Sequence, residues 1–159
     1  MSATSKPQAQ YLKDYQAPQF SIKHIDLRFE LAPLKTSVQS TMTINRTDES
    51  NADLLLDGVD LTLISLMVDD KAYDDYTLED EKLIIHNLPE RFILKIENHI
   101  DPQTNTSLEG LYLSGGAYCT QCEAEGFRKI TYYLDRPDVL ASFDVTIIAD
   151  KKYTHLLSN

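Results

Sequence analysis

Three polar side chains at alternate positions in one short segment are the first candidates for chemistry. Gln121, Glu123 and Glu125 are separated by Cys122 and Ala124, so an extended chain would project all three to one face. Carboxylate oxygens accept hydrogen bonds from N–H groups, and their charge is opposite to that of an ammonium group. The spacing therefore indicates a site for an ammonium ligand, although acidic strand faces are more often simply solvated.

Two cysteines in the same segment have CxxC spacing. Cys119 and Cys122 would need to lie at the N-terminus of a helix to form a thioredoxin-like redox site, because the helix lowers the thiol pKa. A structural zinc site would need a second pair of ligands, which the sequence does not offer. Residues 1–15 contain no apolar stretch typical of a signal peptide. We therefore expect two partly buried thiols and a cytoplasmic location.

The four histidines lack the spacing of a zinc site. His24, His86, His99 and His155 each stand more than five residues from the next histidine, and neither an HExxH segment nor a glycine-rich phosphate-binding motif occurs. Glu97 would share a strand face with His99, but two ligands do not make a zinc site. We therefore expect no metal site in this chain.

The elements that must position these residues are predicted to be β-strands. Apolar and polar residues alternate through residues 25–31, 38–44 and 143–149, which is typical of half-buried strands. Shorter apolar runs bounded by turn residues predict further strands at 54–56, 61–68, 77–79, 82–86 and 92–96. These strands predict an all-β sandwich or barrel. The one predicted helix covers Pro137–Ala141, with Asp135 as its cap.

The segment from Leu108 to Arg136 departs from this alternating pattern. It holds four of the five glycines, both cysteines and four of the nine tyrosines. Glycine permits sharp bends and close approach of the backbone, so we expect this segment to face a ligand.

Length and charge limit the class of protein. A chain of 159 residues buries one core more readily than two, so we predict a polar arm over residues 1–17 and one sandwich domain over residues 18–159. Lys and Arg total 15 and Asp and Glu total 25, which gives a formal charge of −10. This charge repels a phosphate backbone and argues against a nucleic-acid partner. The apolar runs are too short to span a membrane, so no membrane partner is expected.

The segment from Gln121 to Asp138 carries a family resemblance. Its sequence, QCEAEGFRKITYYLDRPD, closely resembles the bacterial branch of the aminopeptidase N family, which consists of zinc-dependent gluzincin aminopeptidases. Further similar segments extend the resemblance over nearly the whole chain: YLKDY at 11–15, LEGLY at 108–112, IAD at 148–150 and LLSN at 156–159. The long motif has an unusual composition, so the resemblance is specific.

The resemblance implies the N-terminal domain of such an enzyme, a saddle-shaped β-sandwich that packs against a thermolysin-like catalytic domain. It implies that Glu123 contributes a carboxylate to the site that holds the free α-amino group of a peptide. It also implies that Gln121 lines the first side-chain pocket and hydrogen-bonds near the substrate backbone. A carboxylate in that position would favour free N-termini, because a blocked amine would leave it unpaired. Glu125 is a second candidate, or an acid paired with Arg128 or Arg136.

The chain departs from the family in lacking its catalytic motifs. It contains neither HExxH with a downstream glutamate ligand nor the GxMEN exopeptidase motif, and the family places these, with a catalytic tyrosine, further along than Asn159. We therefore expect an N-terminal piece whose sandwich is incomplete at its C-terminus. No cofactor is expected in this chain, and zinc is expected in the parent enzyme. Without zinc ligands a site cannot activate water, so the chain alone is predicted to be inactive.

Two other functions stay open from the sequence. The chain could be a stand-alone β-sandwich module that binds a partner without peptidase activity, or a thiol or metal protein that uses its CxxC segment. On the peptidase hypothesis, the partners are the N-terminus of a peptide and a missing catalytic domain. An incomplete sandwich would also leave an unpaired edge and exposed apolar surface, so we expect marginal stability or self-association through that edge.

Overall fold

The fold consists almost entirely of β-strands. The computed structural model describes residues 11–48, 50–153 and 155–156, and these contain two short 3₁₀-helices, η1 (Leu12–Asp14) and η2 (Phe127–Lys129). The strands are β1 (Phe20–Glu30), β2 (Thr36–Arg46), β3 (Leu54–Asp57), β4 (Thr62–Val68), β5 (Lys71–Ala72), β6 (Tyr76–Glu79), β7 (Lys82–Ile85), β8 (Arg91–Ile100), β9 (Gly110–Ser114), β10 (Ala117–Gln121) and β11 (Ser142–Ile148). No helix in the described ranges is long and apolar enough to cross a membrane. The prediction of an all-β fold is confirmed.

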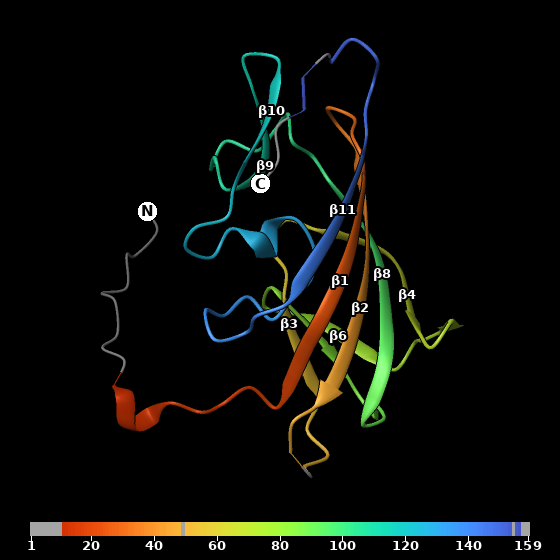
Figure 1. Ribbon diagram of the computed structural model, residues 1–159, viewed down its shortest axis with the longest axis vertical. Helices are drawn as coiled ribbons and strands as arrows, with labels where there is room; N and C mark the ends of the chain where they lie inside the picture. The colour runs from red at the N-terminus through yellow and green to blue at the C-terminus, as the bar shows by residue number, and fades with distance from the viewer. Residues whose placement is uncertain (1–10, 49, 154, 157–159) are drawn as a thin grey trace.

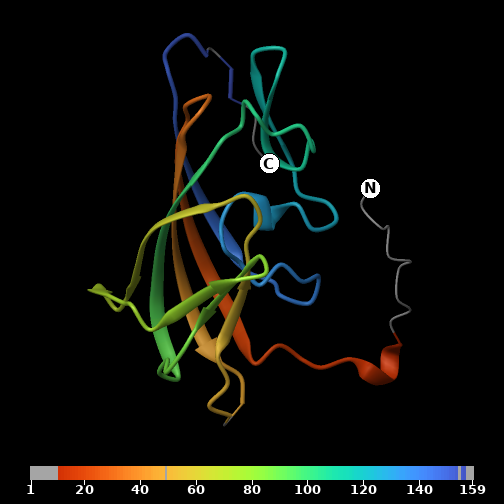
Figure 2. The ribbon, with the colours of Figure 1, turned by 180° about the vertical axis from the view of Figure 1, so that it is seen from behind.

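The described residues form three sheets. The largest has the strand order β11–β1–β2–β8–β4–β5, a second has the order β3–β7–β6, and β9 pairs with β10 in a hairpin. Within the large sheet β1 and β11 run parallel, whereas the other neighbours are antiparallel. The three-stranded sheet lies across one face of the large sheet, and the hairpin stands at the end where β11 finishes (Figures 1 and 2).

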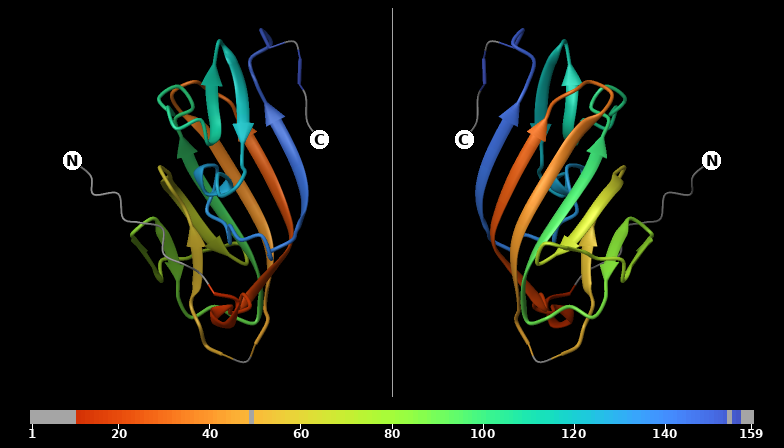
Figure 3. Two further views of the ribbon diagram at one scale, coloured as in Figure 1. Left: turned by 90° about the vertical axis from the view of Figure 1, so that its left-hand side faces the viewer. Right: turned by 90° about the vertical axis from the view of Figure 1, so that its right-hand side faces the viewer.

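The hydrophobic core lies between the large sheet and the three-stranded sheet. Figure 3 looks onto the large sheet, whose strands lie side by side across its face. Ile25, Met42 and Leu94 point inward from the large sheet and are fully buried, as are Leu56 and Ile85 from the small sheet. Burial of a side chain of this size stabilises the folded chain by about 1.5–3 kcal/mol. The two layers of a sandwich thus follow from strands with one apolar face each.

The alternation predicted for residues 25–31 is confirmed in β1, where Ile25 and Leu27 are buried and Asp26 and Arg28 are exposed. The alternation predicted for residues 143–149 also produces a strand, but that strand is hardly buried. β11 lies at the edge of the large sheet, and Val145 is 48% exposed. An edge strand has one neighbouring strand instead of two, so less of the surface of its apolar side chains is buried.

The helix predicted over Pro137–Ala141 is wrong. The chain makes a turn there, in which the Val139 N–H donates to the Arg136 carbonyl at 3.1 Å. The predicted cap, Asp135, instead accepts hydrogen bonds from Arg128. The Asp135 carboxylate is therefore bound by Arg128 and does not cap a helix N-terminus.

The prediction that Gln121, Glu123 and Glu125 share one strand face is also wrong. β10 ends at Gln121, and the chain then forms the Cys122–Gly126 turn, closed by a hydrogen bond from the Gly126 N–H to the Cys122 carbonyl at 2.9 Å. A side chain at Gly126 would place its Cβ 2.4 Å from the Gln121 carbonyl oxygen. The close approach that defines this turn therefore requires glycine.

Candidate functional site

The segment after the Cys122–Gly126 turn is fixed to the large sheet. Asn98 of β8 is fully buried and donates from Nδ2 to the Ile130 carbonyl at 2.9 Å. Thr131, also fully buried, donates from Oγ1 to Ser40 Oγ of β2 at 3.2 Å. These contacts hold the chain where η2 ends, so the turn before η2 projects from a rigid base.

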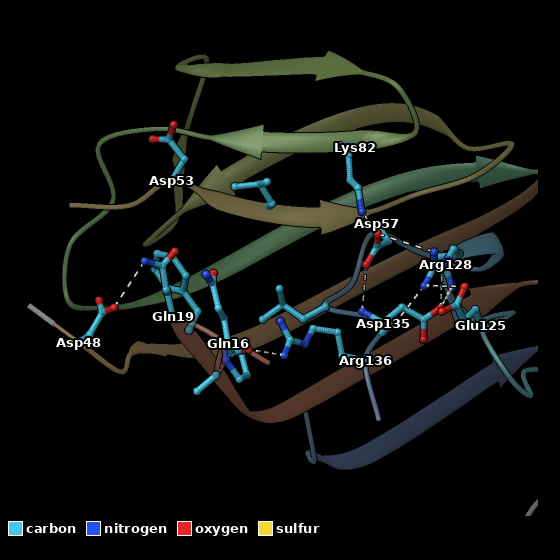
Figure 4. Close-up of a pocket in the computed structure, with 15 residues that line it drawn as sticks. Gln16, Gln19, Asp48, Asp53, Asp57, Lys82, Glu125, Arg128, Asp135 and Arg136 are labelled. Carbon is cyan, nitrogen blue, oxygen red and sulfur yellow. Dashed lines mark hydrogen bonds and ion pairs between the residues drawn. The ribbon is translucent and has the colours of Figure 1, made fainter. Parts of the chain in front are cut away.

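Arg128 of η2 ties the same segment to the three-stranded sheet (Figure 4). Its backbone N–H and its Nε donate to Asp135 Oδ2 at 3.1 and 2.9 Å, and its Nη2 donates to the Asp135 carbonyl at 3.1 Å. Its Nη1 lies 3.8 Å from Oδ1 of Asp57 at the end of β3, which also pairs with Lys82. The Asp135 N–H donates to Asp57 Oδ2 at 3.3 Å. One guanidinium thus joins a turn, a loop and a strand.

The charges in this network compensate one another. The side chains of Asp57 and Asp135 are only 13% and 12% exposed, and that of Arg128 is 20% exposed. Burial by itself lowers the pKa of Arg128, but the hydrogen bond with Asp135 and the negative charges around it raise that pKa overall. The guanidinium therefore stays charged, and each buried carboxylate keeps a cationic partner.

The two glutamates of the turn differ in what they contact. Glu125 Oε2 lies 3.4 Å from Arg128 Nη2, so the pairing of Glu125 with Arg128 considered from the sequence is confirmed. The Glu123 side chain is exposed, and within the described part of the chain its carboxylate has no hydrogen-bond or ion-pair partner. Gln121 lies next to it, since its Nε2 donates to the Glu123 carbonyl at 3.2 Å. The structure thus brings Gln121 and Glu123 together, whereas Glu125 is paired with Arg128.

A cleft of about 650 Å³ lies beside the Arg128 network (Figure 4). Its walls come from residues 16–20, from β3 and from residues 134–136. Arg136 Nη2 donates to the Gln16 carbonyl across it at 2.8 Å, which anchors the described part of the predicted arm; residues 1–10 lie outside the described ranges. Neither Gln121 nor Glu123 lines this cleft, so the candidate ammonium acceptor lies outside it.

The cysteines do not form a reactive pair of thiolates. Cys119 and Cys122 are free and partly exposed. Burial raises the pKa of the Cys122 thiol, and the negative charge of Asp135 raises it further. A redox-active CxxC needs a lowered thiol pKa at a helix N-terminus, whereas here β10 and a turn carry the motif. The geometry therefore offers no support for a thiol function.

One group of three metal-ligating side chains occurs among the described residues, formed by His24, Asp26 and Asp144. The spacing of the histidines along the sequence could not reveal it, because β1 supplies two of the residues and β11 the third. The Arg128 network was missed for the same reason, since Asp57 and Asp135 meet only in the folded chain. Neither group leaves a local signal in the sequence.

Most of the chain matches a known protein family. A model described as the peptidase M1 N-terminal domain matches residues 16–159. The chain belongs to the peptidase M1 family. It is 56% identical to aminopeptidase N of Escherichia coli over 98% of its own length and 18% of that protein's. It is 47% identical to aminopeptidase N of Caulobacter vibrioides, again over 98% of this chain and 18% of the relative.

Solved structures agree with this peptidase M1 assignment. Legionella pneumophila aminopeptidase A, solved in complex with aspartic acid, is 34% identical and superimposes with a TM-score of 0.86 over 94% of this chain and 18% of that one. Native yeast LTA4 hydrolase shares the fold at 23% identity, with a TM-score of 0.66 over 81% of this chain and 23% of its own. The chain therefore spans less than a quarter of the length of these relatives.

Removal of the Asp135 charge should destabilise the fold more than removal of the Glu125 charge. Both carboxylates face Arg128, but Asp135 is 12% exposed and Glu125 is 69% exposed. Asp135→Asn should lower the free energy of unfolding by about 3 kcal/mol, because it leaves a poorly solvated guanidinium short of a partner. Glu125→Gln should lower it by about 0.5 kcal/mol, as for an exposed pair. Urea unfolding of both variants measures the difference, and equal losses would contradict the assigned role of Asp135.

Proposed function

We propose that this chain is the part of a zinc aminopeptidase that receives the free α-amino group of a peptide, with Glu123 as the acceptor and Gln121 beside it. The observation that carries the proposal is the Glu123 carboxylate, which is exposed and unpaired among the described residues on a turn whose far end is anchored to both sheets. A carboxylate held in place without an internal cation is suited to an external one.

The comparisons support a peptidase as the parent protein. Two of the relatives bear the name aminopeptidase N, and the Legionella aminopeptidase A was solved with aspartic acid, which is itself a free α-amino acid. A free amine is the group that distinguishes the end of a peptide from its interior. The proposed role of Glu123 matches that distinction chemically, because an ammonium group can neutralise and hydrogen-bond a carboxylate.

Specificity in this proposal arises from the Glu123 carboxylate in two ways. A substrate ammonium forms charge-assisted hydrogen bonds with Glu123, which fixes the distance from the N-terminus to the bond that is cleaved. An acylated or internal nitrogen carries no charge and would leave the carboxylate desolvated without a partner. Gln121, which already donates to the Glu123 carbonyl, orders the backbone that carries the acceptor and offers its amide oxygen to the substrate.

Zinc belongs, in this proposal, to a part of the enzyme beyond this chain. Solved relatives of the same fold are described as M1 zinc metallopeptidases. The present sequence contains no HExxH segment, so its residues do not fit the ligand set of such a centre. Zinc bound elsewhere would supply Lewis-acid chemistry, and this chain would supply recognition of the amine.

The 159-residue chain alone should therefore not hydrolyse an aminoacyl anilide. With added zinc, the hydrolysis rate in the presence of the chain should equal the rate in buffer alone, because no residue of the candidate ammonium site activates water. The measurement is release of the chromophore by the purified chain. Hydrolysis that a chelator abolishes and zinc restores would overturn the assignment of catalysis to another domain.

In the longer enzyme, Glu123→Gln should lower kcat/KM for substrates with a free amine. The loss of one charge-assisted hydrogen bond corresponds to about 2 kcal/mol, or roughly a 30-fold fall in kcat/KM. Glu125→Gln is the matched control, since Glu125 pairs with Arg128, and it should change kcat/KM by no more than about twofold. Steady-state kinetics on a dipeptide substrate, with thermal unfolding to check folding, make the comparison. An unchanged kcat/KM in Glu123→Gln would reject the proposal.

A second candidate function is a stand-alone interaction module that pairs with another copy through β11. This strand is an edge of the large sheet, and Phe143, Val145 and Ile148 on it are 44%, 48% and 41% exposed. An edge with free backbone groups and exposed apolar side chains is suited to strand addition.

Self-association through β11 should be reversed by a charge on that strand. Val145→Lys should shift the sedimentation of the chain from dimer to monomer, because lysine on an edge strand opposes strand pairing. Ile93→Lys is the control, since Ile93 is 41% exposed on β8, an inner strand of the same sheet. A chain that stays monomeric at every concentration would refute this second function.

A further inference from the structure

His24, Asp26 and Asp144 meet on the large sheet, on the side opposite the buried residues of β1. The two strands that carry them, β1 and β11, run side by side (Figure 1). We propose that these three side chains bind a divalent cation, and that zinc is the cation they fit best. This site is separate from the candidate ammonium site and from the zinc of the proposed parent enzyme. It would link the edge strand β11 to the body of the sheet.

The register of β1 and β11 places two negative charges opposite each other. Asp26 is the register partner of Asp144 across the parallel pair, and His24 is the partner of Ser142. Like charges that face each other on neighbouring strands destabilise a sheet. The nearest arginine along β1, Arg28, is engaged with Glu30 at 2.8 Å. A cation between the two aspartates would therefore relieve a repulsion that Arg28 does not relieve.

The distances in this group are compatible with metal ligation. His24 Nε2 lies 3.4 Å from Asp26 Oδ1 and 3.5 Å from Asp144 Oδ2, and the three ligand atoms lie within 4.8 Å of one another. Direct N–H···O hydrogen bonds are usually 2.7–3.2 Å long. In a tetrahedral zinc centre with bonds of about 2.0–2.1 Å, neighbouring ligand atoms are about 3.3–3.4 Å apart. The two distances therefore agree with two edges of a zinc tetrahedron.

A hydrogen bond to β11 orients the His24 ring. His24 Nδ1 lies 2.8 Å from Ser142 Oγ, and Ser142 Oγ also lies 3.3 Å from the Lys23 carbonyl oxygen. Because Nδ1 faces the serine, Nε2 faces the two carboxylates. The serine thus orients the ring as an outer partner of a metal-bound histidine does.

The donor set discriminates among cations. One imidazole nitrogen and two carboxylate oxygens suit zinc and its first-row neighbours, whereas calcium and magnesium prefer oxygen ligands alone. The side chains of His24, Asp26 and Asp144 are 33%, 60% and 79% exposed, so solvent can reach the group and water can complete the coordination. An ion from solution therefore has a path of entry.

Zinc titration of the 159-residue chain tests the site. Isothermal titration should be done in the Cys119→Ser/Cys122→Ser background, so that thiols do not bind the metal. One zinc ion per chain is expected, with a rise in melting temperature on zinc addition. His24→Gln and Asp144→Asn should each abolish the one-to-one binding, and Ser142→Ala should weaken it about tenfold. Cobalt should give the absorption of a four-coordinate centre in the parent background and not in His24→Gln.

His86→Gln is the matched control, because His86 Nδ1 lies 3.0 Å from a single carboxylate, that of Asp53. It should leave zinc affinity unchanged, and circular dichroism of each variant checks that the sheet is intact. Absence of stoichiometric binding would overturn the proposal. Binding that survives both His24→Gln and Asp144→Asn would overturn it as well.

Discussion

The guanidinium of Arg128 joins the segment after β10 to the rest of the fold through two carboxylates that are almost removed from water. Asp135 accepts from both the backbone and the side chain of Arg128, and Asp57 brings in the end of β3. Buried charges are tolerated only when each is paired and hydrogen-bonded. The position of η2, and with it the position of the Cys122–Gly126 turn, is therefore held by the same electrostatic requirement that keeps these three groups together.

The same network explains why the turn presents one carboxylate and not two. Arg128 also lies close to Glu125 and forms an ion pair with it. Glu123 precedes Glu125 by two residues, and its side chain is exposed to solvent. A cationic ligand competes poorly for a carboxylate that already has an internal cation. The cleft beside the network is likewise lined by charges that are largely satisfied internally.

The large sheet carries a second constraint at its edge. β11 returns to pair in parallel with β1, so residues from the two ends of the sequence become neighbours. This pairing leaves apolar residues of β11 exposed and sets Asp26 opposite Asp144. Both features bear on the stability of the edge strand. Its exposed apolar residues lack packing partners, and Asp144 on it faces the like charge of Asp26.

The sequence determined those properties of this protein that depend on local pattern. Alternating apolar and polar residues specify strands and their buried faces, as in residues 25–31, because a strand places successive side chains on opposite sides. A long, unusual motif likewise pointed to the peptidase M1 family, which the comparisons establish. The candidate pair of Gln121 and Glu123 also came from that motif.

Tertiary structure alone decided how those residues are arranged. The local sequence is compatible with a helix that begins at Pro137 and with an extended strand through Glu125. In the folded chain, however, Asp135 accepts a hydrogen bond from Arg128. The backbone at Gly126 also turns back against Gln121. The partners Asp57 and Asn98, and the meeting of His24 with Asp144, come from strands far apart along the chain. Local propensities are worth a fraction of a kcal/mol per residue, whereas an unpaired buried charge costs about 3–5 kcal/mol, so the long-range ionic contacts prevail over the local preference.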